Sequence, residues 1–308
     1  MHPAFSVIFF TVSSGAGFGL FALIYLADAF KLGGGLLAMQ VVPYGVMALA
    51  LIAAGLISST FHLANPKNAW RAVARFRTSW LSREGVFALA FFPVALLYLL
   101  LTRVDAQGLQ TLRMLAGGLA TILAWMTLFS TGMIYACLKT IRQWNTPLVP
   151  LNYLALGHFS GALLLLLVAP MKNYPVYVMV LLVFAALLKG VYYFWIRSVA
   201  GASTIQTATG FTRAQVKLLD AGHTHGTFLT QEFGFQLARR HALALKIFVF
   251  AAGFGFPLLG LAGLLGEVNQ VMVALVGASA ILGLLAERWL FFAEARHVVN
   301  LYHGAPRC

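Results

Sequence analysis

The stretch VMVLLVFAALL, residues 178–188, is apolar at every position. A second run of the same kind, LLLLLV, occupies residues 163–168. Neither run alternates between apolar and polar side chains, as a membrane-spanning β-strand would. Both runs lie within apolar segments of roughly 20 residues, the length that a helix needs to cross a bilayer. They therefore predict membrane-spanning α-helices.

The composition extends this prediction to the whole chain. Of the 308 residues, 61% are hydrophobic and 9% are charged, and the mean hydropathy is +0.86. A soluble domain carries about 25% charged residues, because its surface is in water. Apolar runs recur from end to end, so neither a signal peptide nor a single anchoring helix accounts for them. We predict an integral membrane protein.

We predict an all-α, polytopic fold of eight spans, arranged as two packed four-helix bundles. The first half, residues 1–140, contains the candidate site motifs discussed below, and the second half is residues 141–308. The second half includes a connection, 197–242, that is too polar to span. The expected spans are residues 4–29, 36–62, 84–103, 111–139, 150–170, 174–196, 243–266 and 270–296.

The basic residues predict the orientation. Eight spans place both termini on one side, together with the two long connections, 63–83 and 197–242. Cytoplasmic connections carry the excess of Lys and Arg, so we expect both termini to be cytoplasmic. The net charge of +13 then reflects topology, and we expect a lipid bilayer and no nucleic acid as partner. Of the 21 basic residues, 17 lie on the side of the termini and four on the other: Lys31, Arg103, Arg113 and Lys172.

A glycine-rich run, SSGAGFG at residues 13–19, lies in the middle of the first span. A dinucleotide-binding loop follows a strand and precedes an acidic residue, and this run does neither. Gly15 and Gly19 are four residues apart and favour close packing of a neighbouring helix. The alternative is that the run lines a cavity.

His62 and Glu84 are the first candidates for chemistry. His62 lies at the end of the second span, and Glu84 opens the third, so both are expected near the cytoplasmic face. An imidazole and a carboxylate together can hold a quinone carbonyl and transfer its protons. The alternatives are that His62 caps a helix end, and that Ser82 and Glu84 form an ordinary negatively charged helix start.

Metal and haem sites are not expected in this chain. The two cysteines provide no thiolate cluster for zinc or iron–sulfur ligation. A spanning haem needs two histidines at matching depth, whereas His158 lies well inside a span and His62 at its end, so we interpret His158 as a hydrogen-bonded polar residue within the bundle. His223 and His225 have zinc-like spacing, but no further ligands lie nearby in the sequence.

Charged residues elsewhere have two interpretations. Glu287 and Arg288, in the eighth span, either border the same cytoplasmic-side pocket or form a plain inter-helix salt bridge. The basic stretch around Arg213 and Lys217 is suited to lipid headgroups or a soluble partner subunit. The second connection presents a similar basic surface for docking a partner, with Arg71, Arg75 and Arg77.

Three short motifs resemble the membrane-anchor subunits of the dimethyl-sulfoxide reductase family. They are HLANP (62–66), SWLSRE (79–84) and the opening MHPAFSVIFF (1–10). The length and the eight spans also agree, so the resemblance covers essentially the whole chain. It implies a quinone-reactive anchor without haem or iron–sulfur cluster, docked on an iron–sulfur subunit and a molybdopterin catalytic subunit. The family's quinone-site His and Glu correspond to His62 and Glu84 alone. The resemblance gives no role to Arg288, which is a further candidate for quinone binding only because of its place in the eighth span.

Orientation separates two uses within that family. Dimethyl-sulfoxide reductase anchors present their quinone-site side to catalytic subunits outside the cytoplasm, whereas the basic residues here place that side inside. The motif AERWLFFAEAR (286–296) and the segment QEFGF (231–235) resemble anchors of cytoplasmic sulfite dehydrogenases more closely. The resemblance implies sulfite oxidation at a bacterial inner membrane. The alternatives are a terminal reductase that oxidises quinol, and a secondary transporter, although the chain shows no convincing inverted repeat.

Overall fold

The computed structural model describes residues 4–61, 65–104, 108–171, 173–199, 203–217, 219, 241–303, 305 and 308. Eight helices within these ranges are long and apolar enough to cross a membrane. The predicted all-α fold is confirmed, and the expected bounds differ from the observed ones by only a few residues. The spans are α1 (Phe5–Phe30), α2 (Ala38–Thr60), α3 (Trp80–Arg103), α4 (Gln110–Ala136), α5 (Leu148–Val168), α6 (Tyr174–Ser198), the composite of α10 (Ala242–Phe250), η3 (Ala251–Gly255) and α11 (Phe256–Gly263), and α12 (Gln270–Ala293).

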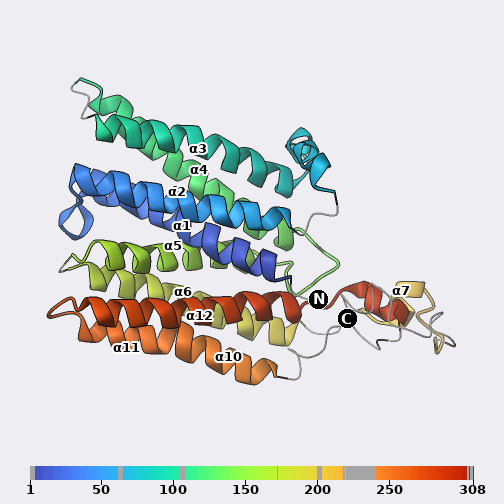
Figure 1. The fold of residues 1–308 in the computed structure, drawn as a ribbon. Helices are drawn as coiled ribbons and strands as arrows, with labels where there is room; N and C mark the ends of the chain where they lie inside the picture. The colour runs from blue at the N-terminus through green and yellow to red at the C-terminus, as the bar shows by residue number, and fades with distance from the viewer. Residues whose placement is uncertain are drawn as a thin grey trace.

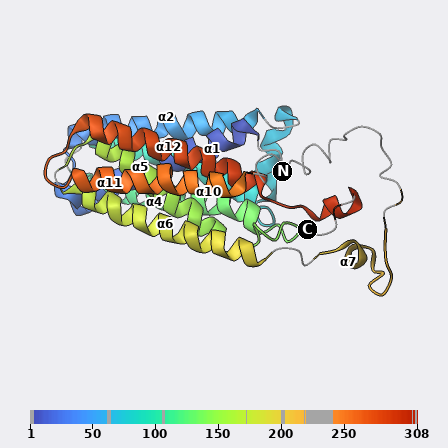
Figure 2. The ribbon, with the colours of Figure 1, turned by 90° about the horizontal axis from the view of Figure 1, so that it is seen from below.

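Successive spans run in opposite directions, so the chain ends gather at one end of the molecule. Figure 1 shows both termini at the same end as η2 (Pro66–Arg75) and α7 (Ile205–Thr209), and Figure 2 shows the same arrangement from below. We call this the termini end. The structure therefore confirms which connections share a side. The compartment that this side faces remains a prediction.

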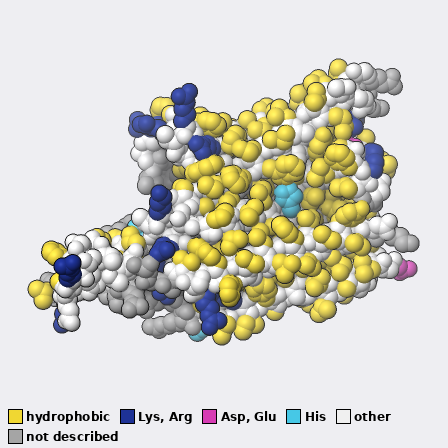
Figure 3. Space-filling view, turned by 180° about the vertical axis from the view of Figure 1, so that it is seen from behind, with side chains coloured by type: hydrophobic (Ala, Val, Ile, Leu, Met, Phe, Trp, Pro, Cys, Tyr) yellow, Lys and Arg dark blue, Asp and Glu magenta, His cyan; other side chains and the backbone are white. Residues whose placement is uncertain are grey.

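The outer surface of the helices is apolar, as a bilayer requires. Figure 3 shows a broad hydrophobic belt along the helices, with most of the Lys and Arg side chains visible in that view gathered near the termini end. Large side chains on this surface, such as Leu187 and Phe184, are more than half exposed. Because lipid replaces water around the belt, these exposed apolar side chains cost nothing there.

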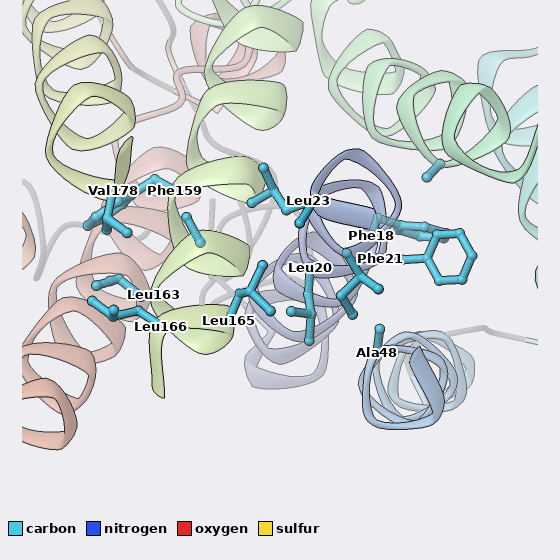
Figure 4. Packing of buried hydrophobic residues seen from close by; sticks show 14 of the residues in the cluster. Phe18, Leu20, Phe21, Leu23, Ala48, Phe159, Leu163, Leu165, Leu166 and Val178 are labelled. Carbon is cyan, nitrogen blue, oxygen red and sulfur yellow. The ribbon is translucent and has the colours of Figure 1, made fainter. Parts of the chain in front are cut away.

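Close contacts between α1 and α5 lie at the centre of the fold. A Cβ on Gly19 would lie 2.0 Å from the Gly157 carbonyl oxygen, and one on Gly161 would lie 2.3 Å from the Leu20 backbone nitrogen. Only glycine allows two helices to approach so closely. Figure 4 shows α1 between α2 and α5, with Leu20 and Leu165 among the buried side chains. This core is continuous across residue 140, and the division into two four-helix halves stays a prediction.

The seventh span contains a π-helical turn, η3, just before Pro257. The Phe256 N–H bonds back to the Ala251 carbonyl, and Pro257 has no N–H to donate. The Ala252 carbonyl therefore needs another donor, and the Ser279 hydroxyl of α12 supplies it at 2.8 Å. This bond fixes the rotation of α12, which carries Glu287 and Arg288, against its neighbour.

Candidate functional site

Glu84 lies in the second turn of α3, and the local sequence turns it toward α4. The helix is capped by Ser79, whose Oγ accepts a hydrogen bond from the Ser82 N–H at 3.4 Å. Glu84 is 5% exposed, and its Oε1 accepts a hydrogen bond of 2.5 Å from Thr131 Oγ1. The alternative interpretation, that Ser82 and Glu84 form an ordinary charged helix start, is therefore wrong: the first turn of α3 holds no acidic residue.

His62 lies outside the described residues, so its position relative to Glu84 stays a prediction. The last described residues before it are Thr60, where α2 ends, and Phe61, its C-cap. This end of α2 lies at the termini end, where α3 also begins (Figure 1). Glu84 is therefore placed within two helical turns of that end.

Lys189, Glu287 and Arg288 form a charge cluster within the membrane-spanning segments. Lys189 is 1% exposed and Glu287 is fully buried. Lys189 Nζ of α6 pairs with Glu287 Oε1 of α12, and Arg288 Nη2 donates to the same oxygen at 2.7 Å. Two positive charges therefore share one carboxylate. The remaining positive charge favours a ligand with electron-rich oxygen atoms, because a buried charge needs a partner.

Both interpretations of the eighth span hold in part. The inter-helix salt bridge exists, but Glu287 makes it with Lys189. Arg288 pairs with Glu287 on its own helix and also lines a cavity. In the sequence, Lys189 counts only as one of the basic residues that set the topology. Its position in an apolar run, ALLKG (186–190), could have marked it as a candidate site residue, because an ionisable residue within a span is functional by default.

Aromatic rings surround the charge cluster. The Arg288 Cζ lies 4.3 Å from the centroid of the Tyr153 ring and 4.9 Å from that of Phe291. The Lys189 Nζ lies 4.2 Å from the centroid of the Tyr192 ring. Cation–π contacts of this kind partly replace the hydration that these cations lose on burial.

The aromatic rings also connect the cluster with Glu84. Tyr135 lies one helical turn after Thr131, the donor to Glu84. The Tyr135 ring stacks on Tyr153, with centroids 5.9 Å apart. Glu84 and Arg288, far apart in the sequence, are therefore joined by a series of neighbouring polar and aromatic side chains. No sequence pattern connects these two residues.

The first basic surface is formed by η2 and the turn that follows it. Arg71, Arg75 and Arg77 are exposed. Arg83 attaches this segment to α3: its Nε donates to the Phe76 carbonyl at 3.0 Å and its Nη2 to the Arg77 carbonyl at 2.8 Å. The three exposed guanidinium groups are therefore presented from an anchored corner.

A second basic surface follows α7. Arg213 and Lys217 are exposed, and two backbone hydrogen bonds between Ser203 and Cys308, at 3.3 and 3.0 Å, tie this segment to the carboxyl terminus. Both basic surfaces lie at the termini end (Figures 1 and 2). They are the two candidate docking surfaces for a soluble partner.

Both ring nitrogens of His158 have partners. Its Nε2 accepts a hydrogen bond from Trp125 Nε1 at 2.8 Å, so its Nδ1 carries the proton and faces the Leu154 carbonyl at 2.8 Å. The prediction of a hydrogen-bonded histidine within the bundle is confirmed.

The described residues contain no group of three or more His, Cys, Asp and Glu side chains placed to hold a metal ion. His223 and His225, the candidates with zinc-like spacing, lie outside the described residues. The absence of a metal in this chain therefore stays a prediction.

Comparison with known proteins defines the class. The chain belongs to the DMSO reductase anchor subunit (DmsC) family, whose model matches residues 1–293. It is therefore a multi-pass membrane anchor subunit, and family membership implies partner catalytic and iron–sulfur subunits. The chain is similar to a sulfite dehydrogenase subunit of Allochromatium vinosum, with 36% identity over 323 residues that cover 98% of this chain and 99% of that protein. The family resemblance inferred from the sequence is confirmed.

Proposed function

We propose that the chain is the quinone-reactive anchor of a molybdopterin and iron–sulfur oxidoreductase. It passes electrons between the iron–sulfur subunit and the quinone pool, and its complex oxidises sulfite. One observation carries the proposal: the buried polar series from Glu84 to Arg288 lies toward the same end of the molecule as both basic surfaces. Electrons from a subunit docked there need to travel only a short way into the membrane.

Reduction of a quinone consumes two electrons and two protons. Glu84, held by Thr131, is the buried carboxyl group able to give and regain a proton, and His62 is its proposed partner at the membrane edge. Arg288 supplies positive charge and N–H donors for a carbonyl oxygen. No haem or iron–sulfur cluster is expected in this chain, which a reduced-minus-oxidised spectrum of the purified subunit tests.

The location follows from the basic residues. We infer a bacterial inner membrane, with both termini and both docking surfaces in the cytoplasm. Arg71, Arg75 and Arg77 form one docking surface for the iron–sulfur subunit, and Arg213 and Lys217 form the other. The molybdopterin catalytic subunit then also lies on the cytoplasmic face.

The comparisons with known proteins bear on each alternative. Similarity over almost the full length to a sulfite dehydrogenase subunit favours sulfite oxidation. The matching family model is described as a DMSO reductase anchor, so a terminal reductase that oxidises quinol is the second candidate. Family membership leaves the secondary transporter without support.

The test uses the assembled complex with His62→Leu and Glu84→Gln variants. Each variant should still assemble and transfer electrons from sulfite to a soluble dye, but should lose quinone reduction. Glu267→Gln is the matched control, because Glu267 is exposed at the opposite end of the bundle. Full quinone reduction by both variants in assembled complexes would refute the assignment of these residues.

A further inference from the structure

We infer that the quinone ring binds between α1, α5 and α12, with one carbonyl oxygen at Tyr153 and Arg288 and its isoprenoid tail in an adjacent apolar groove. This inference rests on the proposed function and gives it a location. Glu84 is not among the residues that line either cavity. Its place is behind the pocket, connected through Thr131, Tyr135 and Tyr153.

The tail site is a groove of about 440 Å³. Residues of α1, α5 and α12 form most of its walls. The side chains that line it are almost all apolar, among them Val12, Leu163 and Leu284. Ile281, also in the wall, is 42% exposed, so the groove reaches the lipid-facing surface. A ligand can therefore enter from the bilayer without crossing the protein.

The carbonyl site is a small cavity of about 20 Å³ beside the groove. Its lining includes Gly15, Tyr153 and Arg288. Four residues line both the groove and the small cavity: Val12, Ala16, Ser160 and Leu284. A cavity of this size holds one water-sized group, which suits the single oxygen of a ring carbonyl whose ring remains in the groove.

The open space beside Gly15 belongs to this small cavity. The residue is buried in α1, yet a Cβ added to it would meet no atom within 4 Å. Gly19, one turn further along, would meet the Gly157 carbonyl at 2.0 Å. The expectation of close helix packing is therefore confirmed at Gly19, whereas at Gly15 the alternative of a cavity lining holds.

Two polar groups at the carbonyl site lack a full set of partners. The Tyr153 hydroxyl is buried and makes no hydrogen bond of good geometry, although it lies beside the Arg288 guanidinium and Tyr135. A ligand or water that accepts a well-aligned hydrogen bond from it would remove the cost of burying it. Arg288 belongs to the cluster with one positive charge in excess. A quinone carbonyl accepts hydrogen bonds from both groups, and it gains negative charge during reduction, when the excess charge stabilises it most.

The position argues against a phospholipid as the occupant. Arg288 lies five residues before the end of α12, or about 8 Å along the helix axis. The polar end of the site is therefore inside the spanning segment, below the level of lipid headgroups. A phosphate group does not fit a cavity of about 20 Å³, whereas one carbonyl oxygen does.

The experiment uses the assembled complex and two quinones, a benzoquinone without a tail and the same ring with a decyl tail. Gly277→Leu places a side chain in the groove, where an added Cβ meets nothing within 4 Å. Gly15→Ala occupies the carbonyl cavity, and Tyr153→Phe removes one donor. The matched control is Gly263→Leu, because Gly263 is equally open but belongs to neither cavity.

We expect Gly277→Leu to raise the KM for the decyl quinone, relative to that for the tail-less quinone, about tenfold. Gly15→Ala and Tyr153→Phe should raise the KM for both quinones, and the control should change neither. Quinone that copurifies with the complex, measured after solvent extraction, should fall in the same three variants. Gly15→Ala should not weaken folding, because alanine is the better helix former.

The outcomes separate the two proposals. A wild-type complex that transfers electrons from sulfite to a dye but reduces neither quinone refutes the proposed function. Normal KM values for both quinones in Gly15→Ala and Gly277→Leu, with quinone reduction intact, place the site elsewhere in the chain and overturn this inference. Loss of copurifying phospholipid without any change in KM makes a lipid the occupant, which also overturns it.

Discussion

Lys189 of α6 and Glu287 of α12 form an ion pair that is buried almost completely within the spanning segments. The same carboxylate also holds Arg288, so it neutralises part of the charge of two cations. Removing one member of a buried charge cluster costs much more than removing an exposed charge, because the partners stay buried without compensation.

The first prediction concerns this cluster. Glu287→Leu leaves Lys189 and Arg288 without their shared anion, and should destabilise the subunit by about 3–5 kcal/mol. Lys189→Met should cost less, since the Arg288–Glu287 pair remains. Thermal unfolding of the detergent-solubilised subunit measures both effects. Equal stability of the Glu287→Leu and wild-type subunits would contradict the charge assignment.

The second prediction concerns the opposite end of the molecule. Asp28 is buried, and there it accepts hydrogen bonds from Tyr98 at 2.8 Å and Arg113 at 2.7 Å, joining α1, α3 and α4. Tyr98→Phe should lower the free energy of unfolding by about 1.5–3 kcal/mol, the cost of a hydrogen bond to a charged group. The KM for quinone should not change, because the proposed site lies toward the termini end. A raised KM in this variant would show that the two ends are coupled.

The third prediction tests the docking surfaces. Charge reversal of Arg71, Arg75 and Arg77 together should release the soluble subunits from membranes at physiological salt, where exposed ion pairs are already weakened. Reversal of Arg213 and Lys217 tests the second surface by itself. Lys31 and Arg103 provide the control, because both are exposed at the opposite end. Sedimentation of membranes followed by immunoblotting measures release. If the subunits stay bound in both variants, docking lies elsewhere.

The fourth prediction concerns orientation. A reporter that is active only outside the cytoplasm should be silent when fused at Cys308 or between Arg213 and Gly226. The same reporter inserted at Gly108, which lies between α3 and α4, should be active. Activity at Cys308 would invert the topology and favour a reductase of the dimethyl-sulfoxide type.

The orientation has a bioenergetic consequence. A quinone reduced near the cytoplasmic face takes its protons from the cytoplasm, where sulfite oxidation also releases protons. The enzyme should then move no net charge across the membrane. Acidification of the outside medium during sulfite-driven quinone reduction, with quinol oxidation blocked, would contradict this.

The eight spans and their grouping into two sides could be predicted from the sequence. Span length and hydrophobicity are local properties, because each helix satisfies its own backbone hydrogen bonds in lipid. Arg71, Arg75 and Arg77 also lie where the sequence placed them, on a connection at the termini end. Family membership was visible too, because short motifs such as SWLSRE survive in the linear order of residues.

The contacts of the buried polar residues could not be predicted in this way and became visible in the folded protein. The sequence did not show that Lys189 meets Glu287, or that Glu84 is connected through Tyr135 to Arg288, because such contacts depend on which helices are neighbours and on how each is rotated. Gly15 and Gly19 illustrate the same limit. They are equivalent in the sequence, yet one faces a hollow and the other a backbone, since α5 crosses α1 closely at Gly19 and leaves space beside Gly15.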